Sequence, residues 1–208
     1  MKKITFLILV LVVCACKKED SNTAIPAPPP MQSLPATNFI YSSKSLEKHI
    51  KFNSELSQYE LVQLENPQSF SITELNFPVK ENEFEYNKSK DFKFYTPFNF
   101  EKDKIEYKVI TYHSYGENDT KVLNVQLNSY SDGKPIDALL LDCRFVFETE
   151  YYREFSIKED GTILIKKVTI NGLNYDDDGN IIGTKAVKDT TTENLNYKLN
   201  STGSFTKI

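Results

Sequence analysis

Residues 139–157 carry apolar side chains at alternate positions, and this pattern constrains the fold more than any other feature of the chain. The apolar positions are Leu139, Leu141, Cys143, Phe145, Phe147, Tyr151, Phe155 and Ile157. Alternation with a period of two is typical of a strand that buries one face. A single strand of this length would extend about 60 Å, which is longer than strands usually are. The pattern therefore predicts two strands with a bend or break near residues 150–153, and it places Arg144 on the solvent-facing side.

Three polar or reactive residues fall in phase with apolar positions. Arg153 breaks the alternation, and two interpretations are open: it marks the strand break, or it points into a cavity with an acidic partner. Cys143 is in phase with its apolar neighbours, which predicts a buried, unreactive thiol. His113 is in phase with an apolar run and is predicted to be a hydrogen-bonded residue near the core, not a catalytic base.

The rest of the chain repeats the strand signal. Alternating positions occur in residues 121–130, where Leu123, Val125 and Leu127 oppose Asn124, Gln126 and Asn128, in residues 92–100 and in residues 195–199. Pro97 predicts an edge strand or an interruption within residues 92–100. The dipeptides Asp132-Gly133, Asp160-Gly161 and Asp178-Gly179 favour tight hairpins. We therefore expect an all-β or β-dominant antiparallel meander that forms a sandwich or a barrel-like sheet, with one short helix near Ser45.

The N-terminus has the parts of a secretory signal peptide. A basic head, Lys2 and Lys3, precedes an apolar run of about ten residues, where spanning a bilayer takes about 20. The run ends in Val13-Cys14-Ala15-Cys16, which resembles the lipobox of bacterial lipoproteins. Cys16 is the matching cysteine because Ala15 supplies the small residue before it. The resemblance implies that residues 1–15 are removed and that Cys16 carries a diacylglyceryl group of the palmitate type, which anchors the protein to a membrane.

Lys18, Glu19 and Asp20 follow the anchor. They resemble the tag that sends some lipoproteins of Gram-negative bacteria to the outer face of the outer membrane. The resemblance implies a surface-exposed protein, with the periplasmic face as the alternative. Residues 16–37 are rich in proline, which predicts an extended tether on the order of 60 Å long. Residues 38–208 are then expected to form a single β-rich domain.

Composition excludes some functions. The chain without residues 1–15 has 23 basic and 29 acidic residues, and this acidic balance argues against a nucleic-acid partner. The chain has 26 Phe and Tyr residues but no Trp. Because aromatic platforms that stack on sugar rings often use Trp, its absence makes glycan binding less expected without excluding a Tyr-based site. No pattern indicates a cofactor.

Two groups of acidic residues are candidate sites. Asn174, Asp176 and Asp178 resemble a fragment of a calcium loop, but Lys185 stands where such a loop needs a bidentate acid, so a hairpin turn is the better interpretation. Glu148 and Glu150 share a strand face and could in principle act as paired carboxylates, but a solvated sheet face explains them better. Cys14 and Cys16 lack the further ligands that a zinc site needs.

Three hypotheses about function remain from the sequence. The first is a binding module whose β-domain holds an unknown protein or glycan ligand. The second is an immunity or inhibitor protein that neutralises a toxin. The third, an envelope enzyme, is the least supported because the chain shows no set of nucleophile, base and orienting residue.

Overall fold

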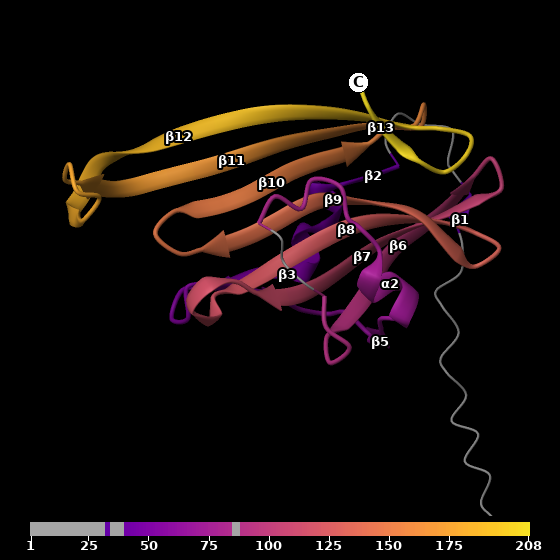
Figure 1. Ribbon diagram of the computed structural model, residues 1–208, viewed down its shortest axis with the longest axis horizontal. Coiled ribbons are helices and arrows are strands. Elements are labelled where there is room, and N and C mark those ends of the chain that lie inside the picture. Colours follow the sequence, from indigo (N-terminus) through magenta and orange to yellow (C-terminus); the bar gives the residue numbers. More distant parts are fainter. Residues whose placement is uncertain (1–31, 34–39, 85–87) are drawn as a thin grey trace, which may run out of the picture.

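Eight consecutive strands, β6 to β13, form one antiparallel meander in the computed structural model (Figure 1). The structure describes residues 32–33, 40–84 and 88–208. The meander strands are β6 Lys93–Lys102, β7 Ile105–Tyr115, β8 Lys121–Ser131, β9 Lys134–Val146, β10 Glu150–Ile157, β11 Thr162–Tyr175, β12 Ile181–Leu199 and β13 Phe205–Lys207. Each strand pairs with the next one in the chain. The prediction of a β-dominant antiparallel fold is confirmed.

Shorter elements lie at the margins of this sheet. They are β1 Gln32–Ser33, β2 Tyr41–Ser42, α1 Ser43–Leu46, the 3-10 helix Glu47–His49, β3 Ile50–Asn53, β4 Gln58–Leu61, β5 Gln68–Ser69, α2 Ile72–Asn76 and the 3-10 helix Glu117–Asp119. The β1 and β5 strands pair with β6, β2 pairs with β10, and β3 pairs with β4 in a separate hairpin. Among the described residues no helix has the length and apolar character needed to cross a membrane.

The predicted turns are hairpin turns. Asp132 and Gly133 both have positive φ, 49° and 73°, between β8 and β9. Gly161 and Gly179, each with φ of 84°, lie in the turns that join β10 to β11 and β11 to β12. These backbone angles are the ones for which Asp-Gly and Asn-Gly pairs are favoured. The β11–β12 hairpin is the longest and projects beyond the other strands (Figure 1).

The short helix expected near Ser45 is also present. It begins at Ser43, so Ser45 lies inside it and Ser42 is the N-cap residue. Leu46 is fully buried against the main core. The β6 strand has a register shift between Tyr95 and Phe98, which fits the interruption expected at Pro97.

The alternation in β9 is less simple than predicted. Leu139, Leu141 and Cys143 are buried as expected, but Leu140 and Asp142 between them are buried too. A register shift, in which Val125 pairs with Asp142 and Gln126 with Leu140, interrupts the alternation. Leu139 and Leu141 therefore lie in the main core, whereas Cys143 packs with Leu140 in a second cluster and does not share their face as predicted. Phe147 is 48% exposed because the chain leaves β9 at Val146. The predicted break therefore lies at residues 147–149, slightly before the expected place.

Arg144 was expected to face solvent, and that expectation is wrong. Its Nε donates to Asp142 at 2.5 Å, and Asp142 is fully buried. The Asp142 carboxylate needs this cation, because a buried charge without a partner is costly.

Strand β8 is buried on both faces, in contrast to the half-buried strand that the alternation predicted. The Gln126 side chain donates to Asn128, Asn128 donates to the Tyr130 hydroxyl, and Tyr130 donates to Glu74 at 2.8 Å. Glu74 belongs to α2, so this short helix is joined to the polar face of β8 at Tyr130. Burial is tolerated because these polar side chains have partners.

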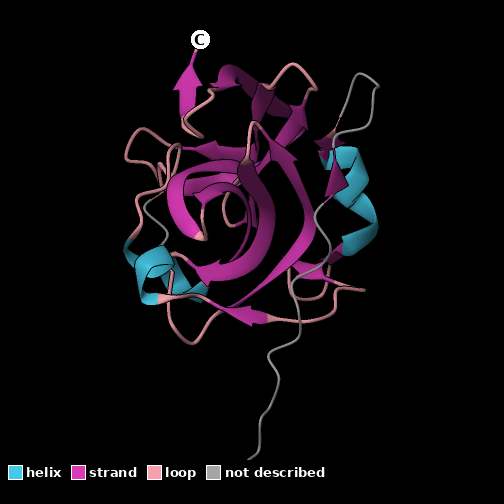
Figure 2. Cartoon of the chain, turned by 90° about the vertical axis from the view of Figure 1, so that its right-hand side faces the viewer, coloured by secondary structure: helices cyan, strands magenta, loops and turns pink. Residues whose placement is uncertain are grey.

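The sheet curls around its main core, as the view in Figure 2 shows. Residues from β6 through β13 meet in this core, including Phe100, Leu127, Leu139 and Leu195. Strands β9 and β13 are joined across the core, because the Asp137 carboxylate accepts a hydrogen bond from the Phe205 N–H at 2.8 Å. Lys80 bridges the same point, pairing with Asp137 and donating to the Phe205 carbonyl.

Candidate functional site

Strands β9 and β10 separate soon after the turn that joins them. They pair only where Phe145 and Val146 face Tyr151 and Glu150. Beyond this point residues 79–83 occupy the edge of β9: the Lys80 N–H donates to the Ala138 carbonyl at 2.9 Å, and the Leu140 N–H donates to Lys80 at 3.0 Å. A cluster of buried and half-buried charged side chains lies in the opening between the two strands.

Arg153 fills this opening. Its side chain is fully buried, and it donates to the carbonyls of Leu140 at 3.1 Å and Glu81 at 2.9 Å. It also donates to the Tyr151 hydroxyl and to the Glu83 carboxylate, both at 3.0 Å. The second interpretation of Arg153 is therefore the right one: it points inward and has an acidic partner.

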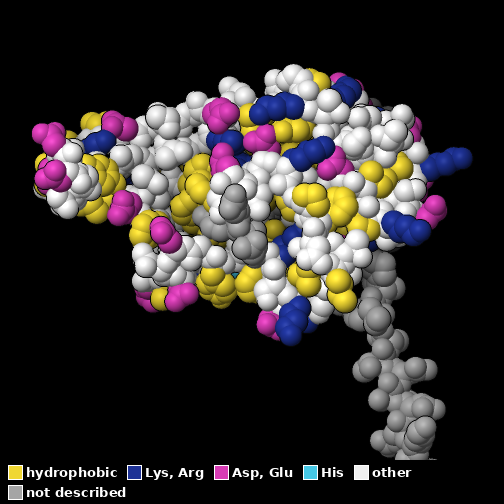
Figure 3. Space-filling model, in the orientation of Figure 1, with side chains coloured by type: hydrophobic (Ala, Val, Ile, Leu, Met, Phe, Trp, Pro, Cys, Tyr) yellow, Lys and Arg dark blue, Asp and Glu magenta, His cyan; other side chains and the backbone are white. Residues whose placement is uncertain are grey.

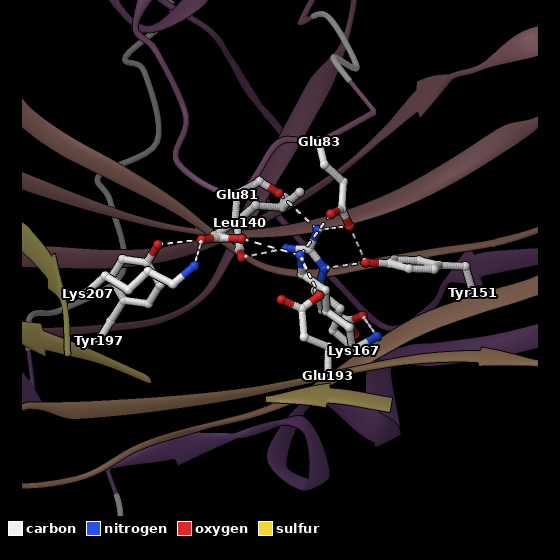
Figure 4. Close-up of polar contacts among 10 residues, drawn as sticks. Glu81, Glu83, Leu140, Tyr151, Lys167, Glu193, Tyr197 and Lys207 are labelled. Atoms are coloured by element: carbon white, nitrogen blue, oxygen red, sulfur yellow. Dashed lines mark hydrogen bonds and ion pairs between the residues drawn. The ribbon is translucent and has the colours of Figure 1, made fainter. Parts of the chain in front are cut away.

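A second buried cation stands beside Arg153. Lys167 is its direct partner in the β10–β11 register, and the side chain of Lys167 is 10% exposed. Lys167 contacts three carboxylates: Glu83 at 2.8 Å and Glu81 and Glu193 at 3.4 Å each. Figure 4 shows that Glu81 and Glu83 extend from the loop segment beside β9, whereas Lys167 and Glu193 extend from the sheet.

Glu81 and Glu83 are held in the charged form. Burial by itself would raise the pKa of Glu83, but hydrogen bonds from Lys167 and Tyr151 and the charge of Arg153 outweigh it and lower the pKa. Burial opposes ionisation of Glu81 in the same way, and hydrogen bonds from Tyr197 and Lys207 overcome it, so the pKa of Glu81 is also lowered. The cluster is thus a network of full charges with each member satisfied, which makes it rigid.

The face of β10, β11 and β12 that carries this cluster changes character along the strands. Cross-strand rows of this face run Ile157–Ile163–Tyr197, then Phe155–Ile165–Leu195, then Arg153–Lys167–Glu193, then Tyr151–Thr169–Thr191. The first two rows are in the main core, the third is the charged cluster and the fourth is polar. The sheet therefore seals at its apolar end and opens to solvent at its polar end.

A groove lies at the open end, over the third and fourth rows. Its volume is about 610 Å³, and it is lined by Glu83, Phe84, Phe145, Thr149, Tyr151, Lys167, Thr169, Thr191, Thr192 and Glu193. Phe145 and Tyr151 are stacked with ring centroids 5.4 Å apart, and Phe84 meets the Tyr151 ring edge-on at 4.9 Å. The groove thus has an aromatic wall, a wall of threonine hydroxyls and a floor of fixed charges, and it can hold a ligand with both apolar and hydrogen-bonding groups.

The carboxylates weighed from the sequence do not meet at this groove. Glu150 accepts a hydrogen bond from the Tyr59 hydroxyl at 2.8 Å, and Glu148 accepts one from Tyr175 at 3.4 Å. Both acids line a second groove beneath the β11–β12 hairpin, beside Lys185 and Lys188. Each has its own structural partner.

The cysteine and histidine lie as expected. Cys143 is fully buried, and burial raises the pKa of its thiol well above the ordinary range. His113 is half-buried, with Nε2 3.0 Å from the Tyr59 carbonyl. Both are structural residues.

The acidic loop Asn174, Asp176 and Asp178 forms the tip of the β11–β12 hairpin. Asp176 Oδ1 accepts from the backbone N–H groups of Asp178 at 3.0 Å and Asn180 at 2.8 Å, and the Asn174 amide donates to the Thr184 carbonyl. The turn itself therefore occupies the Asp176 carboxylate, whose Oδ2 also accepts from the Asn180 amide at 3.0 Å. Among the described residues no three His, Cys, Asp or Glu side chains gather in a way that could hold a metal ion.

The lipidation and export residues, Cys16, Lys18, Glu19 and Asp20, lie outside the described residues. The sequence predicts only part of the charged cluster. Arg153 is a charged residue in phase with apolar neighbours on its strand, and Lys167 and Glu193 occupy positions of the same kind on theirs. Glu81 and Glu83 carry no such signal, since they belong to a segment without periodicity.

Comparison with protein-family models, with curated proteins and with solved structures found no match to this chain. Its function is therefore argued from the geometry of the groove and from the sequence.

Proposed function

We propose that this chain is a membrane-anchored envelope lipoprotein, attached through a lipid on Cys16, whose β-domain binds a ligand in the groove beside Tyr151 and Thr191. The resemblance of Lys18-Glu19-Asp20 to a surface-export tag favours the cell surface as the location of the protein. The groove is the observation that carries the binding proposal, because it joins an aromatic wall, a row of hydroxyls and a fixed charged floor in one concavity.

The floor of the groove is preorganised. Tyr151 donates to Glu83 at 2.5 Å, Glu83 also accepts from Lys167, and Arg153 lies behind all three. Side chains that are already held in place lose little freedom when a ligand binds, which improves affinity. The volume of the groove also falls within the range of about 300–1,000 Å³ that is usual for small-ligand sites.

The alternative of a toxin-neutralising protein would be favoured by a broad acidic surface. On the face seen in Figure 3 acidic and basic side chains are interspersed, and acidic residues gather mainly at the tip of the β11–β12 hairpin. The third alternative, an enzyme, draws no support from the groove, where every titratable side chain is engaged in the ion-pair network. Ligand binding is therefore the function that the geometry supports best.

The proposal can be tested with two matched variants. Thr191→Trp places an indole in the groove, whereas Thr190→Trp places it on the opposite face of the same strand. Envelope oligosaccharides and peptides would be screened by NMR against the isotope-labelled full-length protein. We expect a ligand that shifts the amide signals of Thr149, Thr169 and Thr191, and that is lost in Thr191→Trp but retained in Thr190→Trp. A screen whose binders all shift signals elsewhere would overturn the proposal.

A further inference from the structure

Strand β12 has one long edge that the described part of the chain leaves mostly uncovered. Its other edge pairs with β11 over nearly its whole length. On the open edge β13 pairs only with Tyr197, Lys198 and Leu199, and the Ile208 N–H extends this by one bond to the Asn196 carbonyl at 2.9 Å. No described strand pairs with residues 181–195 on this side.

The direction of the backbone groups on this edge follows from the ladder. The Leu199 N–H donates to Gly161 in the turn before β11, so the odd-numbered residues of β12 bond toward β11. The Asn196 carbonyl points the other way, toward Ile208. Alternation then directs the N–H and C=O groups of Thr190, Thr192 and Asn194 to the open edge.

This part of the edge carries few of the features that protect an edge against pairing: its charged residues are Asp189 and Glu193, which are paired with Lys185 and Lys167. Exposed edges are commonly blunted by lysine, proline or bulges. In β12 such features lie nearer the hairpin tip: Lys185, Lys188 and Gly183, which has φ of 152°. The register is regular from Asp189 to Lys198, and residues 189–196 contain neither lysine nor proline. The stretch is longer than the usual strand of about five or six residues, so it has room to pair with one.

The groove and the open edge meet. Three consecutive residues, Thr191, Thr192 and Glu193, line the groove, although neighbouring side chains of a strand point to opposite faces. The groove therefore borders the backbone of this strand as well as its side chains. A strand laid against this edge would direct alternate side chains into the groove, toward the aromatic wall of Phe84, Phe145 and Tyr151.

We propose that the groove ligand is an extended polypeptide that adds to the edge of β12 as an antiparallel strand over residues 190–194. This inference rests on the proposed binding function and names its ligand class. Main-chain hydrogen bonds to Thr190, Thr192 and Asn194 supply affinity, and apolar or aromatic side chains in the groove supply specificity. The added strand continues the line of β13, which already runs antiparallel to β12 on this edge.

The probe is a phage-displayed library of random twelve-residue peptides, selected on the full-length protein. Enriched peptides would be synthesised and measured against Thr192→Pro and Thr192→Val. Proline removes the outward N–H of Thr192 and leaves the β11 ladder intact, because that N–H does not bond to β11. Valine keeps the backbone donor and the β-branched shape. We expect Thr192→Pro to bind an enriched peptide at least tenfold more weakly than Thr192→Val, which separates the loss of the backbone donor from the loss of the side-chain hydroxyl that lines the groove.

A second measurement does not depend on how the variants fold. Saturating the unaltered protein with an enriched peptide should slow amide hydrogen exchange at Thr192 and Asn194. Peptides that bind Thr192→Pro as well as the unaltered protein, with no added protection, would overturn strand addition. If Thr191→Trp nevertheless abolishes binding of such peptides, the groove is the binding site and only the proposal of strand addition is wrong. The proposal is also overturned if only oligosaccharides bind the groove, or if the edge pairs with a second copy of the chain and no peptide binds.

Discussion

Arg153 and Lys167 lie directly opposite each other on β10 and β11, and the carboxylate of Glu83 contacts both side chains. Like charges in directly opposed positions destabilise a sheet. The arrangement persists because Glu83 stands 3.0 Å from Arg153 and 2.8 Å from Lys167. A segment far away in the sequence thus completes a site that the sheet alone would not tolerate.

Replacing Glu83 by Gln should lower the free energy of unfolding by about 2 kcal/mol near neutral pH, because charge-assisted hydrogen bonds are worth about 1.5–3 kcal/mol. The pKa of Glu83 is lowered in the fold, so its charge stabilises the protein above the unfolded pKa of about 4.3 and this contribution is lost as pH falls through the folded value. Urea unfolding at several pH values should therefore show the difference between the two proteins shrinking below about pH 4. Glu154→Gln, at the exposed Lys166 pair, is the control and should cost little. A pH-independent difference would contradict this account.

Replacing Arg153 by Met should lower the free energy of unfolding by about 3–5 kcal/mol, because it leaves the carbonyls of Leu140 and Glu81 without a donor and breaks a buried ion pair. Lys166→Met on the neighbouring strand should cost no more than about 0.5 kcal/mol, since its pair with Glu154 is solvent-exposed. Chemical denaturation of both variants makes the comparison. Similar losses for the two would mean that Arg153 does not hold β9 and β10 in place.

The pKa of His113 is lowered in the fold, because burial disfavours the imidazolium and Lys121 repels it, against the opposing effects of the Tyr59 carbonyl and Glu60. The unfolded chain therefore binds a proton more readily, and stability should fall as pH drops through the unfolded value of about 6.5. His113→Gln should lose less stability than the unaltered protein between pH 7.5 and pH 5.5. NMR titration of the His113 ring, in the folded and in the urea-unfolded chain, measures the shift directly. A folded pKa above the unfolded one would refute the prediction.

Cys16→Ser should release the protein from membranes and abolish its labelling by radioactive palmitate, because Ala15-Cys16 is the junction that resembles a lipobox. Cys14→Ser should do neither. Membrane fractionation and labelling of both variants decide the matter, and a label that survives in Cys16→Ser would assign the lipid to another residue.

Replacing Lys18, Glu19 and Asp20 together by Ala should leave the protein membrane-bound but hide it from protease added to intact cells. The reason is the resemblance of these residues to a surface-export tag. The unaltered protein serves as the control and should be degraded under the same conditions. Protection of the unaltered protein would instead place it on the periplasmic face.

The local patterns of the sequence were sufficient to predict the strands and their hairpins. Period-two alternation identified residues 195–199, and Asp132-Gly133 and Asp160-Gly161 located two of the turns. The turn at Gly161 even sets the register that brings Arg153 opposite Lys167, because a short hairpin leaves no other pairing. These features depend on neighbours in the chain, so the sequence determines them by itself.

Burial on two faces and the groove depended on contacts between distant segments. Gln126 and Asn128 look like solvent-facing residues, but Gln126 accepts from Tyr112 and Asn128 donates to Tyr130; Arg144 looks exposed until Asp142 is buried beside it. Glu83 follows no periodic pattern and reaches Arg153 from 70 positions away in the chain. Alternation reports which side chains share a face, but only the tertiary structure decides which faces are covered, because covering a face requires a second segment whose position no local pattern encodes.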